Sequence, residues 1–278
     1  MKKHHNQITG VPAYWKSSNI YLKGGHNRVK LGKDIFMHNT KIKLFGNATL
    51  ELDDDVYMEG CTFMIKDSHV HIGRDTEMMK VGIYAYDKSH CDIGPKSTLT
   101  GEFDLKAGAE ITAERLWCTW PPLVAAKGGK ITMGDCGLAD TVIYNTDYHP
   151  IYEYSGERIN PNKDVVIEDS VWVGRKTTVL KGVRLGRGCI LGFGCIVSKD
   201  VPPHCIVAGQ PARVVKENIV WSADEKLTPT DMFPITTDEE ANIFLKRGQY
   251  DGERFLCTKK TWMPYNKFRT LLAVLRSK

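Results

Sequence analysis

The sequence of 278 residues contains no apolar run of about 18 residues, the length that a membrane-spanning helix requires. Its first seven residues, from Met1 to Gln7, include two lysines, but no apolar stretch follows them, so they do not read as a secretory signal. We therefore expect a protein without a transmembrane segment that stays in the cytoplasm.

Cysteine pairs and a large charge excess are also missing. None of the eight cysteines belongs to a Cys-x-x-Cys pair, so we expect reduced, mostly buried thiols. The formal charge of +5 is small for this length and too diffuse to indicate nucleic-acid binding. It suits a phosphate-rich cofactor or an acidic acceptor.

The most informative feature that is present is a repeat of six residues. A helix repeats every 3.6 residues and a strand every 2, so neither alone explains this period. Short strands with a corner every six residues do explain it: large aliphatic residues point inward, small residues stand where the wall bends, and three strands complete a triangular turn. An ordinary β-sandwich would not keep one period so strictly. The two repeating series are Ile167, Val173, Val179, Leu185, Leu191 and Val197, and Val171, Thr177, Val183, Cys189, Cys195 and Val201.

Upstream the same signal is weaker. Strand-like alternations, each followed by Gly, Asn or Asp turn residues, occur at Ile42/Leu44, Leu50/Leu52, Phe63/Ile65 and Val70/Ile72. We therefore predict an N-terminal extension over residues 1–20 and an irregular N-terminal β-helix over residues 21–135. The segment 117–122 must interrupt the regular pattern, because its paired prolines cannot lie inside a strand ladder.

The regular coil predicted for residues 136–216 is interrupted once and then ends. Residues 145–163 contain Pro150, Gly156 and Pro161 and are predicted to form a projecting loop, the kind of segment that carries function. Residues 217–278 form a tail. Its last stretch has an apolar helical face, expected to pack on the body of the protein or on a neighbouring subunit, made of Phe268, Leu271, Leu272 and Leu275.

Four short motifs follow one another between residues 130 and 216: 171–174 (VWVG), 182–186 (GVRLG), 192–202 (GFGCIVSKDVP) and 208–213 (AGQPAR). Each is weak alone, but the ordered set resembles the hexapeptide-repeat acetyltransferases, in particular the maltose and galactoside O-acetyltransferases and those of surface-polysaccharide synthesis. The resemblance implies an all-β solenoid: a left-handed parallel β-helix with a projecting catalytic loop and a C-terminal tail containing a helix. It also implies a homotrimer that uses acetyl-CoA, bound in the groove between two coils.

The resemblance places the catalytic histidine at His149, which stands at the family's distance before Trp172. An alcohol is a poor nucleophile until its proton is removed, and an imidazole is the usual acceptor of that proton near neutral pH. The expected reaction is a direct transfer between two aligned substrates, with a backbone N–H stabilising the oxyanion and the imidazolium protonating the thiolate of CoA. Asp147 is our candidate for fixing the His149 tautomer, although a turn-forming Asp would look the same. Asn145 is a candidate for acceptor binding.

The remaining candidates come from the resemblance one by one. Trp172 matches a tryptophan near the acceptor and the pantetheine arm, whereas Arg175 and Phe193 replace small residues whose backbone meets that arm. The basic candidates match residues near the adenine, the phosphates and the phosphorylated ribose, although each could equally be a solvated charge. The predicted cofactor contacts are Trp172, Arg175, Phe193, Ser198, Lys199, Arg213 and Lys216.

The sequence departs from the galactoside-type pattern before residue 130, where Trp120 and Lys127 lie in segments that lack the family's sugar-binding Asn and Asp. We therefore expect an acceptor other than a simple galactoside or maltose: a sugar hydroxyl of a surface polysaccharide or of its precursor.

Two other interpretations stay open, and a third is disfavoured. The enzyme could N-acetylate an amino-sugar or acetylate a xenobiotic, because such relatives share the histidine and the coil. A scaffold protein on an inactive coil is the non-enzyme alternative. A zinc-dependent carbonic anhydrase needs three converging histidines, and the spacing of the candidates His69, His71, His90 and His204 does not match that pattern, so we expect no metal.

Overall fold

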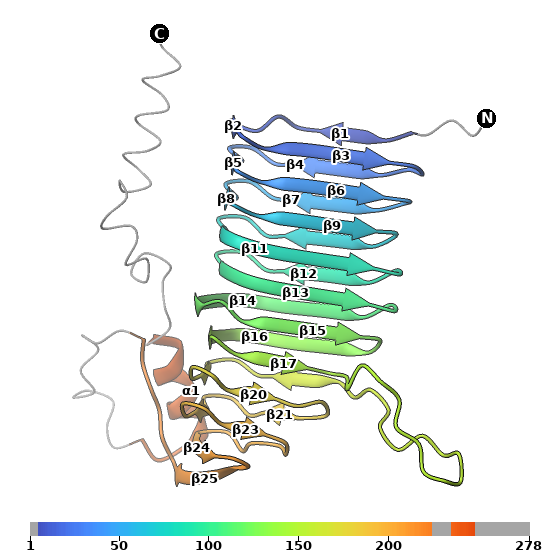
Figure 1. The fold of residues 1–278 in the computed structure, drawn as a ribbon. Coiled ribbons are helices and arrows are strands. Elements are labelled where there is room, and N and C mark those ends of the chain that lie inside the picture. Colours follow the sequence, from blue (N-terminus) through green and yellow to red (C-terminus); the bar gives the residue numbers. More distant parts are fainter. Residues whose placement is uncertain (1–4, 224–234, 248–278) are drawn as a thin grey trace.

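The computed structural model describes residues 5–223 and 235–247, which form a tall coil of about nine stacked turns (Figure 1). Each turn contributes strands to three flat faces, named A, B and C here, and every strand except the last one pairs in parallel with the strands of the adjacent turns. The chain passes from face C to face A and then to face B in every turn. The coil confirms the predicted solenoid.

The strands are assigned to the three faces by their pairing. Face C contains β1 (Gln7–Thr9), β4 (Arg28–Leu31), β7 (Thr49–Leu52), β10 (His69–Ile72), β12 (His90–Ile93), the first parts of β14 (Glu110–Trp120) and β16 (Lys130–Ala139), β18 (Val165–Ile167) and β21 (Arg184–Leu185). Face B contains β3 (Asn19–Lys23), β6 (Lys41–Phe45), β9 (Thr62–Lys66), the second parts of β11 (Glu77–Tyr86) and β13 (Thr98–Lys106), β15 (Leu123–Lys127), β17 (Val142–Tyr144), β20 (Thr178–Val179) and β23 (Ile196–Val197).

Face A contains the other parts of the four long strands together with β2 (Tyr14–Lys16), β5 (Phe36–His38), β8 (Tyr57–Glu59), β19 (Val171–Val173), β22 (Ile190–Leu191) and β24 (Cys205–Gly209). The last strand, β25 (Ala212–Glu217), turns back and pairs antiparallel with β24 at the lower end of the coil. Because β1 and β2 already pair with β4 and β5, the coil begins near residue 7, inside the segment 1–20 that the sequence predicts as an N-terminal extension.

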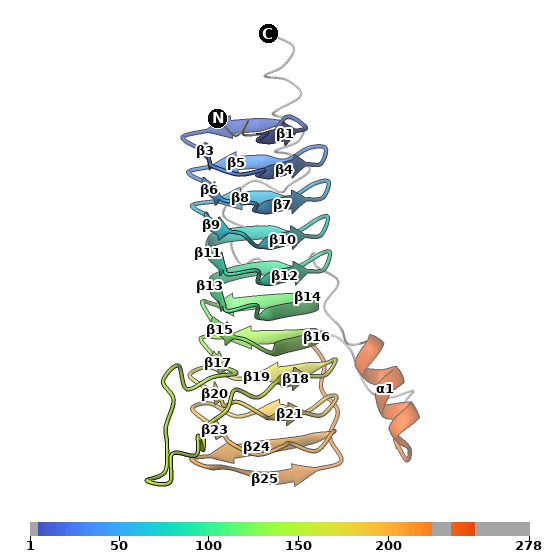
Figure 2. The ribbon, with the colours of Figure 1, turned by 90° about the vertical axis from the view of Figure 1, so that its right-hand side faces the viewer.

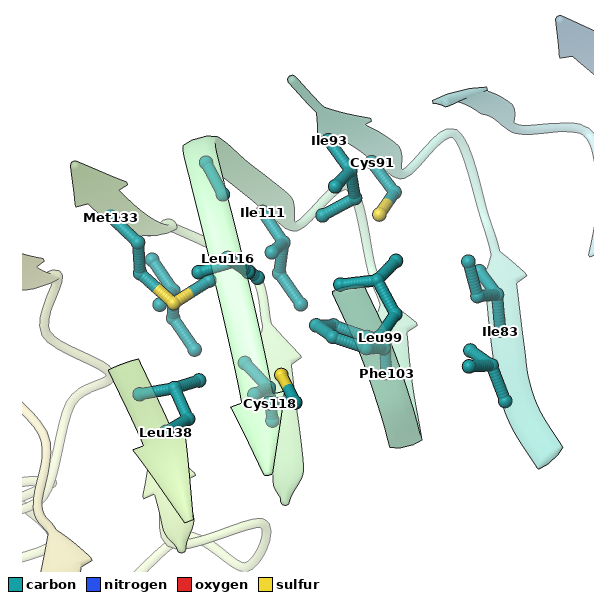
Figure 3. Close-up of a cluster of buried hydrophobic side chains, with 14 of the residues drawn as sticks. Ile83, Cys91, Ile93, Leu99, Phe103, Ile111, Leu116, Cys118, Met133 and Leu138 are labelled. Atoms are coloured by element: carbon teal, nitrogen blue, oxygen red, sulfur yellow. The ribbon is translucent and has the colours of Figure 1, made fainter. Parts of the chain in front are cut away.

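The core is a continuous column of inward-facing side chains. The residues of the four predicted alternations, from Ile42 to Ile72, are at most 1% exposed, because alternate residues of a strand point to one side. Figure 3 shows the middle of this column, to which Phe103, Leu116 and Met133 contribute side chains from successive turns. Each buried side chain removes its apolar surface from water, worth about 1.5–3 kcal/mol for a large aliphatic or aromatic residue.

The described cysteines are all buried free thiols, as predicted. Burial raises the pKa of Cys91 and of Cys118 to about 12, because a thiolate inside the apolar column would lose its hydration. These side chains therefore serve as small apolar groups.

The turns differ in length between the upper and lower parts of the coil. In the upper part, Arg28 pairs with Thr49 and Thr49 pairs with His69, so each turn there is longer than three hexapeptides. In the lower part, Trp172 pairs with Ile190, and this spacing along the chain equals three hexapeptides. The hexapeptide pattern is therefore a property of the lower turns.

The described part of the tail folds back onto the coil. Helix α1 (Asp238–Arg247) begins at a capping box, in which Thr237 Oγ1 accepts the Glu240 N–H at 3.2 Å and the Glu240 carboxylate accepts the Thr237 N–H. Ala241, Phe244 and Leu245 are buried on one side of the helix. The helix confirms that the tail contains one, whereas the apolar face predicted for residues 268–275 lies outside the described residues. Among the described helices, none has the length and apolarity needed to cross a bilayer.

Candidate active site

The loop at residues 145–163 projects from the corner between faces B and C, on the side of the coil away from α1 (Figure 2). It leaves face B after β17 and returns to face C at β18, and its two ends meet where the Lys163 N–H donates to the Asn145 carbonyl at 3.1 Å. The excursion therefore begins and ends at one corner of one turn.

A buried asparagine fixes the start of the loop. The Asn145 side chain is fully buried; its Oδ1 accepts the Lys127 N–H at 2.9 Å, and its Nδ2 donates to the Gly128 carbonyl at 2.5 Å. Both ends of the amide are therefore occupied by the turn above. The geometry makes Asn145 an anchor of the loop and gives no support to the predicted contact with the acceptor.

The next residues set the direction of the loop. Thr146 Oγ1 donates to Asn162 Oδ1 at 2.8 Å and accepts the Tyr148 N–H at 3.0 Å. Tyr148 has a left-handed backbone with φ of 60°, a conformation that needs support from its surroundings in a bulky residue. Lys127 provides further support, because its Nζ donates to the Tyr148 carbonyl at 3.0 Å. His149 therefore follows a residue that is held on both sides.

The carboxylate of Asp147 hydrogen-bonds Lys181 and Asn160. Its Oδ2 accepts from Lys181 Nζ at 2.5 Å and from Asn160 Nδ2 at 2.9 Å, rather than from the imidazole of His149. The hydrogen bond from the Lys181 ammonium lowers the pKa of this carboxyl group. The same Asn160 amide donates to the His149 carbonyl at 2.8 Å, so Asp147 positions the backbone of His149 through Asn160.

Asn160 and Lys181 were not found by sequence reasoning. Asn160 is 7% exposed and also accepts the Ile151 N–H on Oδ1 at 2.6 Å, so it ties the outgoing and returning arms of the loop together. A buried Asn before Pro161 looked like ordinary turn chemistry. Lys181 is distant from Asp147 along the chain and reaches it only because the coil stacks the next turn beneath the loop.

The His149 side chain is exposed. Within the described chain, no side chain hydrogen-bonds its ring, and the backbone N–H donates to the Asp147 carbonyl at 2.7 Å. The loop therefore presents a fixed backbone and an open imidazole at the corner between faces B and C. Such a group can accept a proton from a substrate that docks beside it.

Trp172 lies elsewhere, on face A. Its ring is 44% exposed and lies 5.7 Å from the ring of Trp221, which in turn lies 5.8 Å from Trp117. Trp221 comes from the tail, and its Nε1 donates to the Ser170 carbonyl at 2.8 Å. The space for these rings exists because Gly137 stands between Trp117 and Trp172 in the same ladder; a Cβ there would meet the Trp117 ring at 2.4 Å. No pattern in the sequence indicated that the tail would contribute this aromatic ring.

Arg175 and Phe193 lie at the corner between faces A and B. The Arg175 guanidinium stacks 4.2 Å from the centre of the Trp120 ring and lies 3.6 Å from Asp140. Phe193 is 70% exposed, with the Lys176 ammonium 5.8 Å from its ring. The arginine side chain is thus folded along the wall, which leaves the backbone at this corner approachable.

The predicted phosphate contacts cluster at the lower end of the coil. Lys199 and Arg213 line one pocket of about 240 Å³, together with the apolar residues Val197 and Val207. Ser198 and Lys216 are exposed near this pocket, next to Lys199 and on β25 respectively. The structure therefore brings Lys199 and Arg213 together, with the Asp200 carboxylate lining the same pocket.

The candidates of one chain thus lie in separate places. His149 lies at one corner, Trp172 lies on the face that this corner does not border, and Arg175 and Phe193 lie at a second corner. A triangular coil with an open histidine at one corner and an exposed tryptophan on the opposite face defines a class of protein: the left-handed β-helix acyltransferases.

Comparisons with known proteins agree with this class. Residues 164–199 match the family model described as bacterial transferase hexapeptide (six repeats). The chain is 31% identical over 204 residues to the polysialic acid O-acetyltransferase of Neisseria meningitidis, a match that covers 72% of this chain and 87% of that relative. A second match, to the polysialic acid O-acetyltransferase of Escherichia coli O1:K1 / APEC, is 40% identical over 99 residues and spans 34% of this chain and 32% of the relative.

Among solved structures, the polySia-specific acetyltransferase NeuO superposes with a TM-score of 0.57 at 29% sequence identity, covering 84% of this chain and 99% of that one. The chain belongs to the hexapeptide-repeat acetyltransferases and is an acyltransferase.

Proposed function

We propose that this enzyme transfers the acetyl group of acetyl-CoA to a hydroxyl of a carboxylated surface polysaccharide, with His149 as the general base. The observation that carries the proposal is the open imidazole of His149 on a loop whose backbone is fixed by Asn160 and Lys127. The substrate class is supported by the names of the two relatives, which are polysialic acid O-acetyltransferases.

In the proposed reaction, one proton moves from the acceptor through His149 to the leaving thiolate. The neutral imidazole of His149 takes the proton of the acceptor hydroxyl while the oxygen of that hydroxyl attacks the thioester carbonyl of acetyl-CoA. The C–S bond of the thioester then breaks. The imidazolium returns that proton to the departing thiolate, so the enzyme ends unchanged. The fixed backbone of residues 145–149 serves alignment, because misplacing the base by about 1 Å costs large factors in rate.

The cofactor is proposed to lie along a corner of the coil toward its lower end. Lys199 and Arg213, which line one pocket, would hold its phosphates, with Ser198 and Lys216 at the rim. Arg175 and Phe193 would flank the pantetheine arm, with Trp172 nearest to the reacting groups.

The active form is proposed to be a homotrimer in which each site uses two copies. The separation of His149 from Trp172 on one coil supports this, since a neighbouring copy would bring a face A against a corner between faces B and C. Cyclic symmetry closes such a heterologous contact with three copies.

Acetyl-CoA turnover, read as free thiol against a panel of acceptors, tests the function. We expect turnover with a polymer of carboxylated sugars such as polysialic acid, and an acetyl group that mild alkali removes, because an ester hydrolyses where an amide survives. Alkali-stable acetylation of an amino-sugar would favour the N-acetyltransferase alternative. Failure with every carbohydrate would reject the proposal.

A further inference from the structure

Face B carries an unusual column of side chains that points away from the core. The last outward position of each strand on this face, next to the corner with face C, holds a lysine or an aromatic residue in six successive turns. These residues are Lys23, Phe45, Lys66, Tyr86, Lys106 and Lys127. We call them the lysine–aromatic column.

The neighbouring outward column reinforces this character in the upper turns. It contains Tyr21, which is 48% exposed, followed by Lys43, Met64 and Tyr84. The three upper strands of face B contain no acidic residue. Acids appear lower on the face, where Asp104 is paired with Lys106 at 2.7 Å.

Face C balances its charges in the upper turns. On face C, Lys30 pairs with Glu51 at 3.3 Å, and His71 lies between Asp92 at 2.7 Å and Asp53 at 3.4 Å. The corner beside the column carries two acids, Asp67 and Asp87, and one cation, Lys88; the Asp67 carboxylate accepts the Asn47 N–H at 2.9 Å. Among the described residues of the upper turns, face B therefore has the excess of cations over acids.

The lower end of the column touches the catalytic loop. Lys127 Nζ donates to the Tyr148 carbonyl at 3.0 Å, and Lys106 Nζ lies 5.9 Å from the centre of the Tyr148 ring. The next residue is His149. The column is thus continuous with the proposed base, and adjacent strands about 4.8 Å apart give its six positions a length of about 24 Å.

We propose that the lysine–aromatic column binds an extended anionic polysaccharide and leads it along face B to His149. This rests on the proposed function and names where its polymer lies. Lysines spaced along one line meet the carboxylates of successive sugars, while aromatic rings between them pack on the apolar faces of the sugar rings. Single exposed ion pairs are weak, so affinity comes from many contacts with one long chain.

The test removes charge far from the loop. The triple variant Lys23→Gln/Lys43→Gln/Lys66→Gln should bind polysialic acid about tenfold more weakly than wild type in the absence of acetyl-CoA, measured by calorimetry at low salt. Its KM for the long polymer should rise by a similar factor, with the KM for acetyl-CoA unchanged. The control, Arg28→Gln/Lys30→Gln/Lys33→Gln, removes three cations from face C and its corner with face A in the upper coil and should keep wild-type affinity.

Each outcome decides something. Equal losses of polysialic acid affinity in both triple variants would show an effect of net charge alone and would overturn the column. No loss of affinity in either variant would also overturn it. A change of oligomeric state in the face B variant would assign this face to subunit contact and also overturn it. Wild-type protein that binds polysialic acid through face B without acetylating it would retain the column and reject the proposed function. If wild-type protein acetylates polysialic acid normally and the face B variant binds it as tightly as wild type, the proposed function stands and the column is rejected.

Discussion

The upper and lower turns of the coil share one topology but differ in what their surfaces can do. Upper strands such as β6 and β9 have five residues, whereas β20 and β23 have two. The extra residues of each upper turn add outward positions, which form long columns of side chains over face B. The lower turns keep the minimal hexapeptide length, and the proposed chemistry depends on what interrupts them: the loop, the pocket at the lower end and the returning tail.

The difference suggests a division of labour along the coil. The upper turns present a wide, regular surface without the proposed catalytic residues. The lower turns carry those residues on a smaller surface. Changes in the lower part should therefore alter turnover or cofactor affinity, and changes in the upper part should alter stability or polymer binding.

The largest expected effect is at His149. His149→Ala should lower kcat by about 10²–10⁴, the usual contribution of a positioned base, with unchanged affinity for acetyl-CoA. Steady-state kinetics measure kcat, and the melting temperature checks that the variant stays folded. Tyr154→Ala, at the exposed tip of the loop, is the control. Near-normal turnover by the alanine variant would remove His149 from the mechanism.

The pocket at the lower end should affect binding rather than chemistry. Lys199→Ala/Arg213→Ala should weaken acetyl-CoA binding by about ten- to a hundredfold, since both cations line one pocket and charge-assisted contacts to phosphate are lost together. Calorimetry measures this. Lys33→Ala/Lys246→Ala, which removes two cations elsewhere, should bind normally; an equal loss there would place the cofactor in another groove.

Sequence reasoning found the lower turns because each inward residue recurs after six positions, and the buried series from Ile167 to Val197 confirms that pattern. It missed the regularity of the upper turns, whose period is longer than three hexapeptides and is not a multiple of six. A signal existed: Asp34, Asp55 and Asp75 recur once in each upper turn, and each has a left-handed backbone at the same corner.

The candidate site was predictable only in part. His149 was placed by its distance from Trp172, which is a local count along the chain. The partners of Asp147 were not predictable, because Lys181 and Asn160 are brought to it by stacking across an irregular loop. Trp221 was missed for a similar reason, since a tail that returns to face A leaves no periodic trace.

A smaller effect is expected at Asp147. Because its carboxylate holds Asn160 and Lys181 rather than the imidazole, Asp147→Asn should lower kcat by about tenfold or less, through a looser loop and a poorer alignment. The comparison uses Glu157→Gln, which removes a carboxylate from the same loop and should leave kcat unchanged. A loss of kcat as large as that of His149→Ala would instead indicate that Asp147 acts directly on the imidazole.

The smallest effect on catalysis is expected in the upper core. Ile42→Val removes one buried methylene from a fully buried site, so it should lower the free energy of unfolding by about 0.5–1.5 kcal/mol, measured by denaturant titration. Its kcat should equal that of wild type. A change in kcat larger than the loss of stability explains would contradict the division between upper and lower turns.

The central claim is that His149 of one copy acts beside Trp172 of another. Mixing His149→Ala with Trp172→Ala protein, each expected to be inactive alone, after dissociation and reassembly, tests it directly. If each site uses two copies of a closed trimer, random assembly restores both residues in about one quarter of the sites, and we expect about a quarter of the wild-type kcat. If both residues acted on the same chain, no mixed assembly would contain an intact site, and the absence of recovered activity in verified mixed trimers would contradict the account.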